Sequence, residues 1–146
     1  MKRLSRTRAS SPIPRLDTDS AILAVLVAAM ASSGHVESEE GARAGNIVRS
    51  MRRFRNKSTV TVRRKIERVS SLIKTSGVSP VIDAAAGVVP ARLRPAVFAV
   101  VADVLLVDGR FERSEQRFLG RLATSLGLDA DEAQDITDVM RVKNSA

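Results

Sequence analysis

The chain of 146 residues has no cysteine, no tryptophan, no tyrosine and only one histidine. Without cysteine it forms no disulfide, no thiolate metal site and no thiol-based redox centre, which agrees with a cytoplasmic location. The single histidine, His35, leaves little material for a catalytic triad or a histidine-based metal site. Its only aromatic residues are four phenylalanines. We therefore expect a core of alanine, valine and leucine, which suits closely packed helices.

Long hydrophobic runs are also lacking. Residues 21–31 are apolar, and residues 96–107 are apolar except for Asp103, but both runs are well short of the roughly 20 residues that span a bilayer. The basic start followed by an apolar run is typical of a signal peptide, yet Asp17 and Asp19 stand between the two parts. We expect two buried helices in a cytoplasmic protein, with peripheral contact to the inner membrane as a further option.

The net charge of +8 is unevenly distributed along the chain. Residues 1–15 carry five basic residues and no acidic one, and residues 49–74 carry ten basic residues against Glu67 alone. From residue 129 onward acidic residues dominate. A basic flank and an acidic end make the molecule dipolar, which favours oriented association with charged partners.

The sequence contains an internal repeat. Residues 21–50 align with residues 96–125 without a gap, and each copy contains an apolar helix, a turn with glycine, two glutamates three residues apart and a second helix. Because neither unit buries its apolar stripe alone, we expect the two helix–turn–helix units to pack face to face. The identical pairs are Ala21/Ala96, Ala24/Ala99, Val25/Val100, Gly34/Gly109, Glu37/Glu112, Glu40/Glu115, Gly45/Gly120 and Ser50/Ser125.

No segment shows sustained period-two alternation, so the sequence predicts an all-α fold of about seven helices. We expect a disordered basic tail over residues 1–16 and one helical domain over residues 17–143. The expected helices cover residues 17–32, 38–54, 59–76, 79–87, 91–107, 112–126 and 129–143.

Capping signals set several of these ends. Gly77 and Gly127 suit the positions that follow a helix. The Ser-Pro pair at residues 79–80 has the character of an N-cap and a first helical position. Asp129 and Glu132 have the spacing of a capping box that opens the last helix.

The segment 102–115 reads Ala-Asp-Val-Leu-Leu-Val-Asp-Gly-Arg-Phe-Glu-Arg-Ser-Glu and is followed by Leu119 and by Leu-Gly-Leu at residues 126–128. This pattern resembles the TerB family, which is named for tellurite resistance and includes the N-terminal domain of the membrane-anchored co-chaperone DjlA. The resemblance covers residues 17–143. It implies a helical accessory or scaffold protein linked to tellurite resistance or stress response, with an acidic metal site.

Four carboxylates surround the second turn, at Asp103, Asp108, Glu112 and Glu115. Hard cations need several converging oxygen ligands, which such a cluster supplies. The resemblance therefore implies a divalent cation, Ca²⁺, Mg²⁺ or Mn²⁺, with Gly109 allowing the turn. The first turn lacks these aspartates, so any site is confined to the second copy.

A structural interpretation of the same carboxylates stays open. Glu112 and Glu115 lie in the first turn of a predicted helix, where carboxylates favour the helix dipole and the free amides. Asp103 is expected to pair with Arg117 or Arg121. On this interpretation the acidic cluster stabilises the fold and holds no metal.

The basic stretch 49–74 is the second candidate site. It suits a protein partner, a nucleic acid or an anionic membrane surface, where each cation contributes about 1 kcal/mol. The alternative is a solvated helix face, or pairing with the chain's own acidic end. The candidate residues are Arg52, Arg53, Arg55, Arg63, Arg64, Lys65 and Arg68.

Catalytic patterns are lacking. Gly41 and Gly45 fall inside a predicted helix, where glycine favours close helix packing and not phosphate binding. Paired carboxylates alone do not make an acid–base site. We therefore expect a non-enzymatic binding protein with protein partners and no small-molecule substrate.

Overall fold

The computed structural model describes residues 13–32, 45–106 and 111–146. Over these ranges the fold is helical and has no strand, which confirms the predicted all-α class. Residues 45–50 are also helical. The helices are α2 (Thr18–Ser32), α4 (Thr59–Ser76), α5 (Val78–Val88), α6 (Arg94–Leu106), α7 (Arg113–Ser125) and α8 (Ala130–Lys143), with 3₁₀ helices η1 (Arg52–Phe54) and η2 (Ala91–Leu93).

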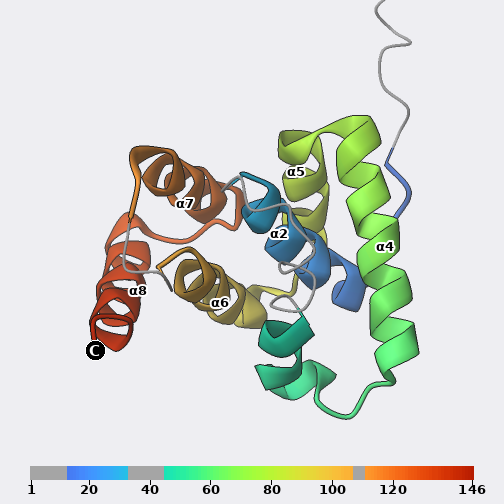
Figure 1. Cartoon of the computed structure of the whole chain (residues 1–146). Coiled ribbons are helices and arrows are strands. Elements are labelled where there is room, and N and C mark those ends of the chain that lie inside the picture. Colours follow the sequence, from blue (N-terminus) through green and yellow to red (C-terminus); the bar gives the residue numbers. More distant parts are fainter. Residues whose placement is uncertain (1–12, 33–44, 107–110) are drawn as a thin grey trace, which may run out of the picture.

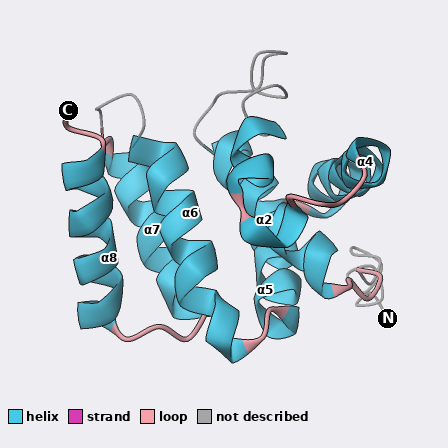
Figure 2. Cartoon of the chain, turned by 90° about the horizontal axis from the view of Figure 1, so that it is seen from below, coloured by secondary structure: helices cyan, strands magenta, loops and turns pink. Residues whose placement is uncertain are grey.

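Helix α2 lies at the centre of the molecule (Figure 1). It is apolar on every side, and 11 of its 15 residues are buried. A helix of this kind is stable only when other helices surround it. Helices α4, α5, α6 and α7 all contact α2. Helices α6, α7 and α8 stand side by side on one flank, and α4 lies at the opposite end (Figure 2).

The packing agrees with the internal repeat. Helices α2 and α6, which begin the two copies, contact each other in the core. The second copy continues into α7 as predicted. The turn of the first copy lies within residues 33–44, outside the described residues.

The predicted helix over residues 38–54 is wrong at its C-terminal end. Met51 has extended backbone, with φ −79° and ψ 130°, so the helix does not continue into the separate η1 turn. This break turns Phe54 inward, where it is only 1% exposed. Burial of an aromatic side chain offsets the loss of one helical turn.

The link between α4 and α5 also differs from the prediction. Gly77 caps the end of α4 as expected, but its positive φ of 92° lets α5 begin at once, at Val78. The N-cap of α5 is therefore Gly77 and not Ser79. Pro80 lies inside the first turn, where its missing N–H costs no hydrogen bond.

The starts of two further helices can be compared with the predicted bounds. Helix α6 begins at Arg94, so Pro95 lies in its first turn and marks its start. Asp129 is the N-cap of α8, but its side chain makes no capping hydrogen bond, so the predicted box with Glu132 does not form. Leu16, assigned to the tail from the sequence, is buried in the core, while residues 1–12 lie outside the described residues.

Candidate functional site

Two aspartates at the start of α2 hold part of the basic stretch. Asp19 pairs with Arg53 and with Lys57, whose Nζ lies 3.0 Å from Oδ2. Lys65 Nζ donates to Asp17 Oδ2 at 2.8 Å. Pairing with the acidic C-terminal end was one of the alternatives for the basic stretch. These three cations pair instead with the start of α2, because folding places α2 nearer to η1 and α4.

These contacts shift the pKa values of both aspartates. The hydrogen bond from Lys65, helped by the N–H of Ser20, lowers the pKa of Asp17 to about 2. Burial by itself raises the pKa of Asp19, but the hydrogen bonds from Arg53 and Lys57 outweigh it, so the pKa is lowered. Both carboxylates are thus ionised at neutral pH and tie η1 and α4 to the central helix.

The helix geometry of α4 separates the predicted basic run. Successive residues of an α-helix point about 100° apart. Lys65 therefore reaches Asp17, while Arg64 and Arg68 are exposed on the outer face. Arg63 points a third way, into a groove beside residues 45–57. The adjacent residues Arg63, Arg64 and Lys65 therefore lie on three different surfaces of the molecule.

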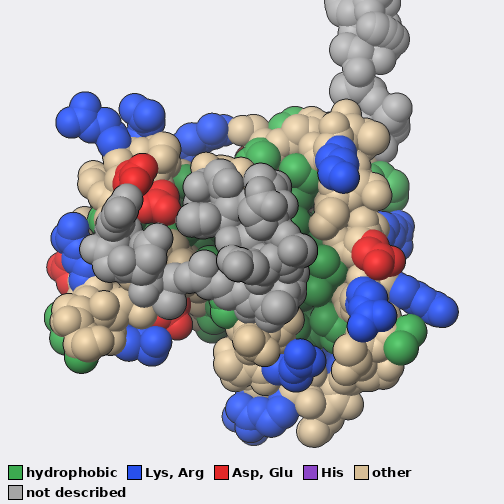
Figure 3. All heavy atoms as spheres, viewed as in Figure 1, with side chains coloured by type: hydrophobic (Ala, Val, Ile, Leu, Met, Phe, Trp, Pro, Cys, Tyr) green, Lys and Arg blue, Asp and Glu red, His purple; other side chains and the backbone are tan. Residues whose placement is uncertain are grey.

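This groove, which we call the basic groove, has a volume of about 540 Å³. Its floor is apolar and is formed by Val48, Phe54, Val62 and Ile66. Val48 and Phe54 are only 2% and 1% exposed, so the floor is continuous with the core. Figure 3 shows hydrophobic side chains next to Lys and Arg side chains in the region of α4 and residues 45–57.

Four cations line the basic groove, at Arg49, Arg55, Lys57 and Arg63. Lys57 is held by Asp19. The three arginines make no ion pair with any residue in the described ranges, and Arg49, Arg55 and Arg63 are all exposed. Within the described part of the chain, the groove therefore presents guanidinium groups without an ion-pair partner above an apolar floor.

The groove includes two residues that sequence reasoning missed. Arg49 and Lys57 were not among the candidates, because a charge run does not tell which side of a helix faces a neighbour. Of the candidates, Arg55 and Arg63 line the groove, whereas Arg52 does not. Phe54 is both a core residue and part of the groove floor. Recognising it as such from the sequence would have placed its neighbours Arg49 and Lys57 beside the groove.

The acidic cluster is divided between structural roles. Asp103 Oδ1 accepts hydrogen bonds from Lys143 Nζ at 3.1 Å and Asn144 Nδ2 at 2.8 Å, so the predicted pairing with an arginine of α7 is wrong. The Glu112 N–H donates to Glu115 Oε1 at 3.0 Å, within a capping box that opens α7. Glu115 is only 8% exposed.

No three His, Asp or Glu side chains come together to hold a metal ion in the described part of the chain. Asp108 and Gly109 lie outside the described residues. The cation site at Asp103, Asp108, Glu112 and Glu115 therefore stays a prediction, and it depends on Asp108.

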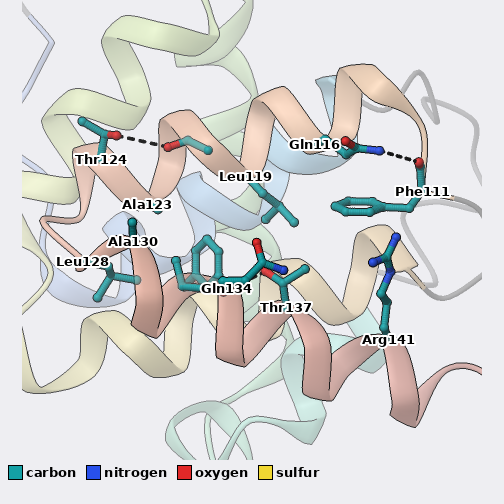
Figure 4. A pocket seen from close by; sticks show the side chains of 13 residues that line it. Phe111, Gln116, Leu119, Ala123, Thr124, Leu128, Ala130, Gln134, Thr137 and Arg141 are labelled. Carbon is teal, nitrogen blue, oxygen red and sulfur yellow. Dashed lines mark hydrogen bonds between the residues drawn. The ribbon is translucent and has the colours of Figure 1, made fainter.

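A second groove of about 490 Å³ lies between α7 and α8 (Figure 4). Gln116 Nε2 donates to the carbonyl oxygen of Phe111 at 3.1 Å, and Thr137 Oγ1 donates to a carbonyl of its own helix at 2.9 Å. The guanidinium of Arg141 lies 5.2 Å from the centre of the Phe111 ring. Much of the polar lining is thus already engaged within the protein.

Among the described helices, none combines the length and apolar character that crossing a bilayer requires. No curated protein and no solved structure gives a significant match to the chain. A family model described as "Tellurite resistance protein TerB" matches residues 19–138. This span runs from the start of α2 to within α8 and includes both copies of the repeat. The chain belongs to the TerB family.

Proposed function

We propose that this TerB family member is a non-enzymatic accessory protein that binds an acidic, amphipathic segment of a protein partner in the basic groove. The observation that carries the proposal is the combination of an apolar floor with Arg49, Arg55 and Arg63, which form no ion pair within the described residues. An amphipathic helix lays its apolar face into an apolar groove, and acidic side chains beside that face complement arginines at the edge of the groove.

Two other partner classes fit the groove less well. A membrane surface is broad, whereas the floor residues Val48 and Phe54 are recessed and almost fully buried. Single-stranded nucleic acids bind through exposed aromatic side chains on which bases stack, and Phe54 is not accessible for stacking. A helix laid in the groove contacts the partly exposed floor residues Val62 and Ile66 and leaves its acidic side chains beside the arginines.

The family assignment supports a role in tellurite resistance or a related stress response, performed in the cytoplasm through partner binding. The chain has no cysteine, so on this proposal its own thiols take no part in tellurite chemistry. A divalent cation at the acidic turn would be a separate, structural feature of the same protein.

The experiment measures binding of a fluorescent acidic amphipathic peptide, anionic phospholipid vesicles and a single-stranded oligonucleotide to the full chain. We expect the peptide to bind, with an affinity that falls as salt is added. The double variant Arg55→Glu/Arg63→Glu should weaken peptide binding by about tenfold or more.

Arg64→Glu/Arg68→Glu is the matched control, because it reverses the same charge on the outer face of α4. It should change peptide affinity by less than about threefold, since distant surface charges are largely screened by salt. Equal losses in both variants would show that net charge, and not the groove, governs binding. Binding of vesicles or oligonucleotide without the peptide would refute the assigned partner class.

A further inference from the structure

The outer face of α8 is both acidic and apolar. Asp131, Asp135 and Asp138 are spaced four and three residues apart, which places them on one face of the helix. All three are exposed. Val139 and Val142 lie on the same side and are 60% and 73% exposed, more than the other large hydrophobic side chains that the structure describes.

These acidic side chains are free to meet a partner. None of the three aspartates forms an ion pair with a described residue, and Asp138 accepts a hydrogen bond only from Gln134 Nε2, at 2.9 Å. The opposite face of α8 packs against α6 and buries Ala133 and Thr137. Within the described residues, α8 is therefore packed on one face, and its aspartates form no ion pair on the other.

We infer that the basic groove of one molecule binds the outer face of α8 of a second copy. This inference rests on the proposed function, because it names the acidic segment that the groove receives. Three aspartates complement the three arginines that form no ion pair with a described residue, and two exposed valines complement the partly exposed floor residues Val62 and Ile66. The chain thus carries both halves of one helix-in-groove contact.

The two surfaces belong to opposite ends of the molecule. Helix α8 lies at one end and α4 at the other in two perpendicular views (Figures 1 and 2). A molecule therefore does not place its own α8 in its own groove. The contact joins two different surfaces, the groove of one copy and α8 of another. An open assembly therefore keeps one groove exposed at one end and one α8 at the other. Association continues at these ends or closes into a ring.

Sedimentation velocity of the full chain tests the inference. We expect larger species as protein concentration rises at low salt, and dissociation at high salt. Arg55→Glu/Arg63→Glu removes the net positive charge of the groove, and Asp131→Lys/Asp135→Lys makes the outer face of α8 basic. Each variant alone should remain monomeric, because the first has lost the positive charge of its groove and the second has lost the acidic face of its α8.

A mixture of the two variants is the decisive sample. The second variant keeps the native groove and the first keeps the native α8, so mixing should restore association. All substituted residues are exposed, and circular dichroism verifies that both variants are folded. Arg64→Glu/Arg68→Glu, on the outer face of α4, should associate like the unmodified chain.

The outcomes separate the two proposals. A chain that stays monomeric at all concentrations, or mixed variants that fail to associate, would overturn homotypic assembly. If the acidic peptide still binds the groove, the proposed function stands and the partner is another protein. If neither the peptide nor a second copy binds, both proposals are refuted.

Discussion

Replacement of Asp19 by asparagine tests how the basic face is attached to the core. The carboxylate is 11% exposed and holds both Arg53 and Lys57, which are 38% and 41% exposed. Asp19→Asn keeps the size of the side chain but removes its charge. Two cations then lose their carboxylate, and η1 loses its ionic contact with α2.

The expected cost lies between two limits. Removal of one partner from a buried ion pair costs about 3–5 kcal/mol, whereas an exposed pair contributes about 0.2–1 kcal/mol. Arg53 and Lys57 are accessible enough to regain water, so we expect a loss of about 2 kcal/mol in the free energy of unfolding. For a domain of this size, Tm should fall by about 4–8 °C.

Thermal and urea unfolding at pH 7, followed by circular dichroism, measure this loss. Asp17→Asn is the matched control, because its side chain is 60% exposed and an asparagine at this position still accepts the N–H of Ser20. The control should lose less than about 1 kcal/mol. An Asp19→Asn protein as stable as the control would refute the reasoning.

The pH dependence gives a second check on Asp17 and Asp19. Both carboxyl pKa values are lowered in the folded state. The contribution of these carboxylates to the free energy of unfolding is therefore complete above the unfolded pKa of about 4. This contribution is lost as the pH falls through the folded pKa values, and the folded pKa of Asp17 is about 2. The stability difference between the native chain and each variant should therefore shrink over this range, and a difference that grows would contradict it.

Three further predictions concern the core, a turn and the cation. Leu122 is fully buried, and Leu122→Ala should cost about 2–5 kcal/mol in urea unfolding, unless the site collapses to fill the space. Gly127 has φ of 70° and an added Cβ meets only an ordinary contact, so Gly127→Ala should cost about 1 kcal/mol through its backbone alone. Calorimetry and melting with Ca²⁺, Mg²⁺ or Mn²⁺ should show binding that Asp108→Asn weakens, and unchanged melting with all three ions would end the cation proposal.

Much of the fold could be predicted because local chemistry specifies it. The apolar composition of residues 21–31 indicated burial on all sides, and the structure places them in the central helix α2. Gly77 and Gly127 marked helix ends, since both adopt the positive φ that glycine favours. The repeat indicated two units with a common core, and the contact between α2 and α6 agrees with it.

The site depended on contacts that no local pattern contains. Arg63 and Lys65 are two residues apart, yet one lines a groove and the other pairs with Asp17. Composition established that the chain is basic and helical, because charge and hydrophobic periodicity are properties of the sequence. Tertiary packing decided which cations Asp17 and Asp19 neutralise and which line the groove without an ion-pair partner among the described residues, because these contacts depend on how residues distant in sequence meet in space.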